Sequence, residues 1–456
     1  MNLKRKETNS IKTQLIKGDY LSFDIKSILE HSDIQEQKKT LKNINQYFYT
    51  NYKGIGKIKV FEQEFEYFSD FHKFWEKNHK KILNPTIHEE KCESVADVLH
   101  DLFVKYGKNI FLELYDTLDL TKEEICKVRL FTANQDFRGS RNFSEFAEIY
   151  RSDPSVFDIK FILEEPQTFL AKLQLQGLSQ SDKRLRYAQI TAEFLYSNGL
   201  EPFDLFSYAN EDYLEIRKLL TELKGSGFGN KKTDMFLRDM RQLNVWPQGK
   251  NYDKIDVASD VNTIRVALRT GILKTDIPLI SSFLDIFCYQ YVLLDKMNAK
   301  AWRRVWEIWK DKYPTETIES PCQMDYLIYK IIGKELCKEK LSFFKCDSEG
   351  HTFFWHSSRN ITCQVCYEEK RERKRASLIF KDLPCKYQEG EIYVSRNRRI
   401  QEKLPELREC PFTKICNSKD PNFVKLQPPK SISILGRTGW TTAMTRKEEG
   451  GGGLMS

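Results

Sequence analysis

The spacing of hydrophobic and polar residues predicts helices over the middle of the chain. From Lys122 to Leu273 apolar residues recur at helical intervals, with short polar breaks between them. Residues 276–315 have the pattern of two more helices. Within them an apolar stripe typical of a core-facing side is formed by Trp302, Val305, Trp306 and Trp309. The first 120 residues add one strand-like run, "KIKVFEQEFEYF". The pattern therefore predicts a mainly α-helical protein.

A glycine-rich turn, "KGSGFGNKKT", joins two amphipathic helical patterns. Gly225, Gly227 and Gly229 permit backbone conformations that other residues rarely adopt. The second helix is expected to begin just after Gly229, so that its free N–H groups point outward beside Lys231 and Lys232. Small residues would let a phosphate reach those N–H groups. The turn is therefore predicted to bind phosphate without reading sequence.

A second polar position lies downstream, in "IDVASDVNTIRVALRTGIL". Asp260 stands at the entry of a predicted helix, with Arg265 in its second turn. Taken alone, Asp260 is explained equally well as a helix cap. Asp256, four residues earlier, is a second candidate acid, but no arginine stands five residues after it as Arg265 does after Asp260.

Together these segments resemble the helix–hairpin–helix DNA glycosylase superfamily, of the endonuclease III-like kind. That family carries a hairpin of the form L-P-G-V-G-x-K-T-A, followed by V-D-x-H-x-x-R-V with the catalytic aspartate. The matching residues are Gly227, Gly229, Lys231, Asp260 and Arg265. Upstream, "LFTANQDFRGS" resembles the family's L-S-A-Q-x-T-D helix, whose glutamine fills the gap left by the extruded base; Gln135 is its counterpart. The resemblance spans about residues 122–275.

The chain departs from the family pattern in several places. Asn262 replaces the family histidine, and Ser226 replaces the hairpin proline. The gap between Lys231 and Asp260 is longer than in the commonest members. Lys232 is a second candidate for the reactive amine, although it stands one position out of register.

The resemblance implies base excision, in which the target nucleotide leaves the stack and enters a pocket. Asp260 would stabilise the positive charge that develops on the sugar and position the nucleophile. Lys231, if neutral, would attack the sugar and form a Schiff base, which leads to strand cleavage. A phosphate contact is an equally good explanation of Lys231. DNA-binding roles are implied for Gly225, Gly227, Gly229, Lys232, Gln135 and Arg265.

The cysteines predict metal. Three of eleven, Cys92, Cys126 and Cys288, stand alone in helical patterns and are expected in the core, whereas the other eight lie in the region from residue 322 to 416. The segment "FFKCDSEGHTFFWHSSRNITCQVCY" has the spacing of a tetrahedral zinc site. Its predicted ligands are Cys346, Cys363, Cys366 and either His351 or His356.

A second metal site is suggested by "ECPFTKIC". Cys410 and Cys416 have a C-x5-C spacing that resembles the end of the iron–sulfur loop of the endonuclease III branch, although the middle C-x2-C is absent. Cys322 and Cys337 are the candidates for the remaining ligands, because a [4Fe–4S] cluster needs four thiolates. The alternative is that these four are unrelated core or surface cysteines.

Composition adds limits to this interpretation. The formal charge is +8, with 40% hydrophobic residues, which indicates a folded protein without proving a polyanionic partner. No apolar run reaches the length of a membrane span, and the start lacks a secretory signal, so we expect an intracellular monomer, in a prokaryotic cytoplasm or a eukaryotic nucleus. Two basic runs, "KRERKR" and "SRNRR", lie between cysteines of the cysteine-rich region.

The expected organisation has five parts. Residues 1–121 form an N-terminal α/β extension, 122–275 the glycosylase core, and 276–340 helices packed on the core. Residues 341–420 form a basic Cys/His-rich metal-binding module, and 421–456 a disordered tail. The expected function is a DNA glycosylase, with or without AP lyase activity. The alternatives are a non-catalytic helix–hairpin–helix DNA-binding or repair scaffold, and a zinc-module adaptor between proteins.

Overall fold

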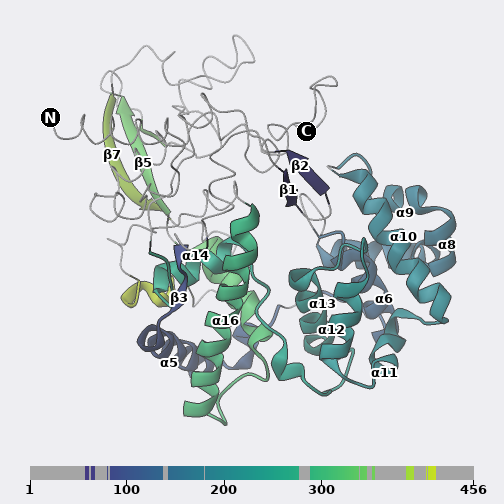
Figure 1. Cartoon of the computed structure of the whole chain (residues 1–456), viewed down its shortest axis with the longest axis horizontal. Helices are drawn as coiled ribbons and strands as arrows, with labels where there is room; N and C mark the ends of the chain where they lie inside the picture. The colour runs from purple at the N-terminus through teal and green to yellow at the C-terminus, as the bar shows by residue number, and fades with distance from the viewer. Residues whose placement is uncertain are drawn as a thin grey trace. The chain divides into compact units, whose positions relative to one another are not determined.

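The chain is drawn in Figure 1 from a computed structural model. The structure describes residues 57–60, 63–66, 80, 83–113, 115–136, 142–178, 180–276, 288–337, 339–346, 352–354, 387–394, 407 and 409–416. These residues form two compact units. One takes its described residues from 57–88, 264–297 and 332–416, and the other from 89–263 and 298–331.

The unit that contains residues 89–263 is helical. Its α-helices are α5 (Glu89–Tyr106), α6 (Lys122–Ala133), α7 (Phe143–Ser152), α8 (Ile159–Glu164), α9 (Pro166–Lys172), α10 (Ser181–Asn198), α11 (Leu205–Tyr208), α12 (Tyr213–Glu222) and α13 (Asn230–Gln242). Its 3-10 turns are η1 (Lys108–Phe111), η2 (Pro154–Phe157), η3 (Pro202–Asp204), η4 (Tyr252–Lys254) and η5 (Pro321–Met324). Three further helices include residues of both units: α14 (Val261–Thr270), α16 (Cys288–Lys312) and the π-helix η6 (Tyr326–Leu336).

Local sequence signals fix several of the helix ends. Thr121 caps α6 and Asn142 caps α7, each in a reciprocal capping box with the glutamate three residues later. Pro166 occupies the first turn of α9, where its missing N–H is not needed. The left-handed Gly199 ends α10. Capping side chains, a proline and a glycine close to each end therefore set where these helices begin and end.

One hydrophobic core holds α6 to α13 together. It is rich in aromatic side chains, and Phe236 and Trp246 meet in it edge to face with ring centroids 5.5 Å apart. Cys126 lies in this core and Cys92 is buried in α5, as predicted; the side chain of Cys288 lies outside the described residues. These cysteines therefore act as small apolar residues.

The predicted tryptophan stripe on α16 also faces a core. Trp302, Val305 and Trp309 are fully shielded from solvent and Trp306 is 4% exposed. Trp309 packs on Phe111 with ring centroids 5.3 Å apart. The stripe is therefore structural, as its spacing indicated. Where two helices were expected in residues 276–315, the described part contains the single helix α16.

The other unit contains short antiparallel pairings. The strand-like run expected as one strand is a hairpin of two, β1 (Lys57–Val60) and β2 (Gln63–Glu66). Two-residue strands β3 (Thr86–Ile87) and β4 (Leu273–Lys274) pair with each other. A three-stranded sheet has the order β6-β5-β7. Its strands are β5 (Glu339–Cys346), β6 (Thr352–Phe354) and β7 (Tyr387–Val394), and a 3-10 turn, η8, covers Pro411–Lys414.

The mainly α-helical class is thus confirmed over the described residues. None of their helices combines the length and the apolar character that a membrane crossing would need.

Candidate active site

The glycine turn lies between α12 and α13, which pack side by side (Figure 1). Gly225 and Gly227 have φ of 85° and 79°, a region that favours glycine. Phe228 is 4% exposed and anchors the turn in the core. Ser226, at the position of the family proline, is fully buried, and its Oγ accepts a hydrogen bond from Phe228 N. Two helices therefore flank the glycine turn, as the spacing predicted.

The turn lies against α10 on its inner side. A Cβ added to Gly227 would stand 2.4 Å from the Tyr187 ring, and one added to Gly225 would stand 2.7 Å from Ile190. Gly229 differs, because a Cβ there would meet nothing within 4 Å. It precedes α13 and contributes no side-chain cap, so the N–H groups of the first turn are open to an outside acceptor. This is the arrangement that an anion requires at a helix N-terminus.

Lys231 and Asp260 are brought together, although they are far apart in the sequence. Lys231 Nζ lies 3.6 Å from Asp260 Oδ2. The lysine side chain is 45% exposed, whereas the aspartate side chain is 13% exposed. The ammonium group also lies over the Tyr329 ring of η6, 5.6 Å from its centroid. A solvent-accessible amine thus faces a carboxylate that is mostly buried.

Asp260 is held in place by the start of α14. Its Oδ1 accepts hydrogen bonds from Asn262 N at 2.8 Å and Thr263 N at 2.9 Å, and its Oδ2 accepts one from Asn262 Nδ2 at 3.1 Å. These bonds fix the orientation of the carboxylate at the start of α14. The helix-cap interpretation of Asp260 is therefore correct, and the cap also places the Oδ2 oxygen at Lys231.

Asn298 of α16 supports this loop from within the core. It is fully buried, and its Nδ2 donates to Ser259 Oγ at 2.8 Å and to Thr263 Oγ1 at 3.0 Å. Thr263 Oγ1 in turn accepts from Asp260 N at 2.9 Å. Asn298 and Thr263 therefore hold the backbone at Asp260 in place through hydrogen bonds.

Asp256, the competing acid, has a different partner. Arg303 Nε donates to its Oδ1 at 2.7 Å. Burial raises the pKa of Asp256, and the Arg303 guanidinium opposes that rise. Among the described residues, Asp260 rather than Asp256 forms the ion pair with Lys231.

Lys232 points away from Lys231, as expected for consecutive residues on a helix. Its Nζ donates to the backbone carbonyl of Asn134 at 2.5 Å and lies over the Tyr187 ring. Burial lowers the pKa of Lys232 to about 7; Asp136 opposes that shift, and Arg184 and Lys231 add to it. The structure therefore places this lysine beneath the turn, and not beside Lys231 as the sequence suggested.

Asn134 joins the end of α6 to both α10 and the glycine turn. Its Nδ2 donates to Tyr187 O at 3.3 Å, Thr191 Oγ1 at 3.2 Å and Ser226 O at 3.1 Å. Since Asn134 also accepts from Lys232, the turn is fastened to the core on two sides.

Two predicted DNA-binding residues are turned inward. Gln135 is fully buried, where its Nε2 donates to Arg184 O at 3.1 Å, so its amide is not displayed for filling a gap in DNA. Arg265 donates through Nη2 to the carbonyl of Gly333 in η6. The sequence resemblance gave the places of these residues but not the direction of their side chains.

The predicted metal ligands are not brought together by the described residues. Among those residues, no three His, Cys, Asp or Glu side chains form a group that would hold a metal ion. Cys322 is 1% exposed and its thiol contacts Tyr252 and Ser320, which is the environment of a core residue. Burial raises the pKa of this thiol to about 12, which disfavours a thiolate there.

The other predicted cysteine ligands belong to the unit with the three-stranded sheet. Cys337 accepts a hydrogen bond at 2.9 Å from Arg269 Nη1, and Cys410 and Cys416 flank η8, partly exposed. Cys346 ends β5. The remaining zinc candidates, His351, His356, Cys363 and Cys366, lie outside the described residues, as do both basic runs and the tail.

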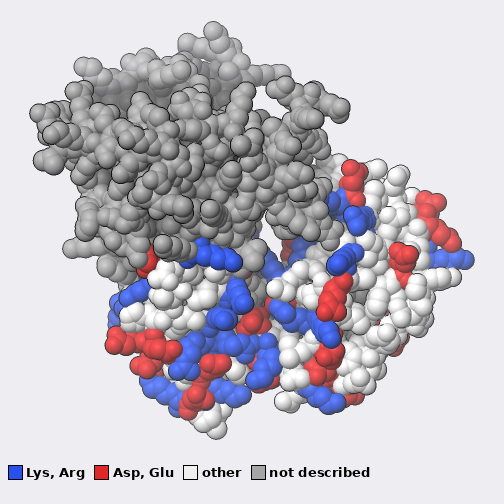
Figure 2. Space-filling view, in the orientation of Figure 1, with Lys and Arg blue, Asp and Glu red and all other residues white. Residues whose placement is uncertain are grey.

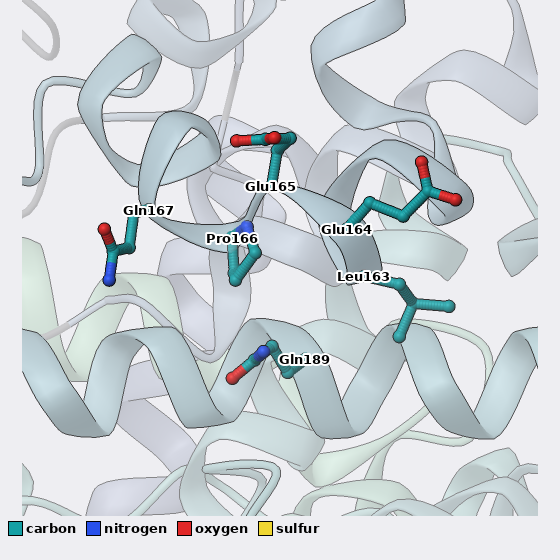
Figure 3. A pocket seen from close by; sticks show the side chains of 6 residues that line it. All are labelled: Leu163, Glu164, Glu165, Pro166, Gln167 and Gln189. Atoms are coloured by element: carbon teal, nitrogen blue, oxygen red, sulfur yellow. The ribbon is translucent and has the colours of Figure 1, made fainter.

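A pocket of about 310 Å³, drawn in Figure 3, has neither Lys231 nor Asp260 in its lining. It is lined by Leu163, Glu164, Glu165, Pro166, Gln167 and Gln189. On the face drawn in Figure 2, lysine and arginine of the described residues are interleaved with aspartate and glutamate. The candidate site is therefore defined by the Lys231–Asp260 pair beside the glycine turn, and not by a cavity or by a surface patch of like charges.

No protein-family model matches the chain, and no curated protein matches it.

Two buried polar residues stand inside apolar sequence patterns. Asn298 is a polar residue four positions before Trp302, on the apolar side of α16. Asp325 is a lone carboxylate in the apolar run "PCQMDYLIYKII". A polar group inside an apolar pattern indicates a buried, structured role. Tyr329 has no comparable signal, because aromatic residues are common on buried helix faces.

Proposed function

We propose that this protein is a DNA glycosylase that extrudes a modified or damaged base and breaks its N-glycosidic bond. The observation that carries the proposal is the pairing of Lys231 Nζ with Asp260 Oδ2 at 3.6 Å, immediately beside the open N-terminus of α13. A phosphate held at that N-terminus would bring the sugar of a neighbouring nucleotide within reach of the pair. The resemblance to helix–hairpin–helix glycosylases supports the same residues in the same order.

Asp260 supplies the negative charge in this proposal. Departure of the base leaves positive charge on the sugar, and a carboxylate fixed by Asn262 and Thr263 can stabilise that charge without first rearranging. The pre-existing orientation matters more than the charge alone, because no reorganisation is needed at the moment of bond breaking.

Lys231 is the proposed nucleophile of an accompanying lyase reaction. Its neutral amine forms a bond to C1′ while the C1′–N bond to the base breaks, and the electron pair leaves with the base. The proton that the amine then loses passes by way of Asp260 to the departing base. Ring opening breaks the C1′–O4′ bond, O4′ takes a proton from water, and C1′ and Lys231 share a protonated imine.

A panel of duplexes, each with one modified base, tests the proposal. After incubation, released base is detected by mass spectrometry, and an unmodified duplex serves as the control. The panel includes oxidised purines, damaged pyrimidines, mismatched thymine and modified cytosines. Release from at least one member is expected, whereas binding without release from any member would contradict an excision activity.

The second candidate function is a non-catalytic helix–hairpin–helix DNA-binding protein. It is favoured by the complete use of Asp260 as a cap, since Oδ1 and Oδ2 together accept three hydrogen bonds from Asn262 and Thr263. Such a protein would bind duplexes through the glycine turn and leave every base in place. The glycosylase is preferred because capping alone does not require a lysine at Oδ2.

A further inference from the structure

The aromatic ring of Tyr329 stands beside the Lys231–Asp260 pair. Lys231 Nζ lies over this ring, 5.6 Å from its centroid, and also lies 3.6 Å from Asp260 Oδ2. The face of an aromatic ring carries negative charge density, which attracts a cation within about 6 Å. The Lys231 nitrogen therefore faces two sources of negative potential, a carboxylate just before α14 and a ring on η6.

Tyr329 reaches this position from an unusual element. It belongs to the π-helix η6, a rare conformation that often occurs at functional sites. The residue is partly buried. Burial raises the pKa of its phenol, and the Asp260 charge adds to that rise, so the phenol is neutral. The attraction on the Lys231 nitrogen therefore comes from the face of the ring and not from a phenolate.

A similar arrangement elsewhere on η6 provides a comparison. Lys330 Nζ lies over the Tyr326 ring, 5.6 Å from its centroid, and pairs with Glu113 Oε1. This second trio contains neither Lys231 nor Asp260. It reproduces the lysine, the carboxylate and the ring of the candidate site at a place where no bond of a substrate is proposed to break.

We propose that Tyr329 is a cation-stabilising residue of the candidate site, whose ring face acts together with Asp260 on the positive charge that develops during base excision. The inference rests on the proposed function, because it deepens the chemistry at Lys231. Nζ becomes cationic as its bond to C1′ forms, while the C1′–N bond to the base breaks and its electron pair leaves with the base. Because the ring face is already directed at Nζ, it stabilises that charge without rearrangement.

A double-mutant cycle measures the attraction between the ring and the amine without DNA. Urea unfolding is followed for the wild-type protein, Lys231→Gln, Tyr329→Leu and the double variant. The two substitutions should be non-additive by about two- to fivefold in the unfolding equilibrium constant, the range for a cation–π pair at an exposed site. In the control cycle Lys218→Gln, at an exposed lysine of α12, replaces Lys231→Gln, and its effect should add to that of Tyr329→Leu.

Fluorination of the ring tests the charge that develops during the reaction. Phenylalanine and its mono-, di- and trifluorinated derivatives replace Tyr329 in the full-length protein by nonsense suppression. Each fluorine withdraws electrons from the ring face and hardly changes its shape. With the duplex that the wild-type protein processes best, base release should slow stepwise along the series. Tyr329→Leu should slow it by about two- to thirtyfold, the range for cation–π pairs from exposed to desolvated sites.

Tyr326 is the matched control for the fluorinated series. The same replacements there weaken the ring that faces Lys330, at an equal distance between the nitrogen and the ring centroid, and leave Tyr329 intact. The rate of base release should therefore stay within about twofold of the wild-type rate in every member of this series.

The two readouts separate this inference from the proposed function. An additive cycle between Lys231 and Tyr329 in folded variants would overturn the inference, and so would equal rates of base release across the fluorinated series. Since the fluorinated side chains keep the shape of the ring, the second result does not depend on the folding of Tyr329→Leu. A non-additive cycle without base release from any duplex would keep the attraction between ring and amine and remove the glycosylase. Base release with an additive cycle would do the reverse.

Discussion

Lys231 and Asp260 begin different helices, yet the lysine Nζ and the aspartate Oδ2 lie 3.6 Å apart. Each position follows from its helix terminus. The glycine turn sets the start of α13, and the carboxylate caps α14 while leaving Oδ2 beside the amine. The distance between the two side chains therefore depends on the backbone at both helix starts. Substitutions of the turn glycines test this backbone geometry, and substitutions of Lys231 and Asp260 test the charges.

Alanine at two glycines of the turn should have different effects. Gly227→Ala forces a side chain into a φ of 79° and into the Tyr187 ring, so the free energy of unfolding should fall by about 2–4 kcal/mol. Gly229→Ala meets no atom within 4 Å, and stability should change by less than about 0.5 kcal/mol. Chemical denaturation of both variants checks the contrast.

Gly229→Ala should nevertheless weaken DNA binding. The added methyl group stands at the N-terminus of α13, where a phosphate would approach, so affinity should fall about three- to tenfold for every sequence alike. Fluorescence anisotropy with unrelated duplexes measures this. Unchanged affinity, or a changed preference among bases, would rule out a phosphate contact at this turn.

Borohydride trapping should distinguish the two neighbouring lysines. If the lyase reaction occurs, Lys231→Gln should lose the covalent DNA adduct. Lys232→Gln should retain it, because the Lys232 amine is bonded to Asn134 O beneath the turn. Loss of the adduct in Lys232→Gln alone would move the nucleophile to the second lysine. Base release without any adduct would make the enzyme monofunctional.

Asp234 should make stability depend on pH. Burial raises its pKa to about 6, against the Arg217 guanidinium, which donates to both carboxylate oxygens at 2.5 and 3.2 Å. An acid with a higher pKa in the folded than in the unfolded chain stabilises the fold below the unfolded pKa, and this contribution is lost as pH rises through the folded pKa.

The free energy of unfolding of the wild-type protein should therefore fall relative to that of Asp234→Asn, by roughly 1–3 kcal/mol between about pH 4 and about pH 6. Urea unfolding of both proteins at several pH values measures the difference. Parallel pH curves would show that Asp234 keeps an ordinary pKa in the folded chain.

Metal content should not depend on Cys322. Its thiol lies in the core against Tyr252 and Ser320, so Cys322→Ser should leave zinc and iron unchanged in anaerobically prepared protein. If an iron–sulfur cluster is present, iron should instead be lost from variants at Cys410 or Cys416. Elemental analysis decides among the cases. Folded, active protein with neither metal would contradict the metal prediction altogether.

The elements that the sequence predicted well are those with local signals. The start of α13 after Gly229 and the tryptophan stripe of α16 follow from a glycine and from helical spacing within a few residues. The prediction of a single strand in "KIKVFEQEFEYF" was wrong, because this segment folds back on itself as β1 and β2. Hydrophobic alternation does not reveal where a strand turns.

Side-chain directions were less predictable. The family resemblance pointed to Gln135, and the glycine turn pointed to Lys232, but each side chain is turned inward by a partner from another helix, Arg184 or Asn134. Asp325 was missed because its hydrogen-bond partner, Arg238, is distant in the sequence. Such long-range polar contacts leave no periodic pattern in the sequence from which they could be predicted.

The most direct test of the central claim compares base release by the wild-type protein and Asp260→Asn. Asparagine keeps an oxygen that can accept from Asn262 N and Thr263 N, so α14 should stay capped and the melting temperature nearly unchanged. Asp256→Asn is the matched control, since that carboxylate pairs with Arg303.

With the duplex that the wild-type protein processes best, the rate of base release is measured at saturating protein. The expected result is a loss of at least about 100-fold in Asp260→Asn, with DNA affinity within about threefold of wild type and with Asp256→Asn close to the wild-type rate. Base release at the wild-type rate by folded Asp260→Asn would contradict the assignment of Asp260, and with it the glycosylase mechanism proposed for this site.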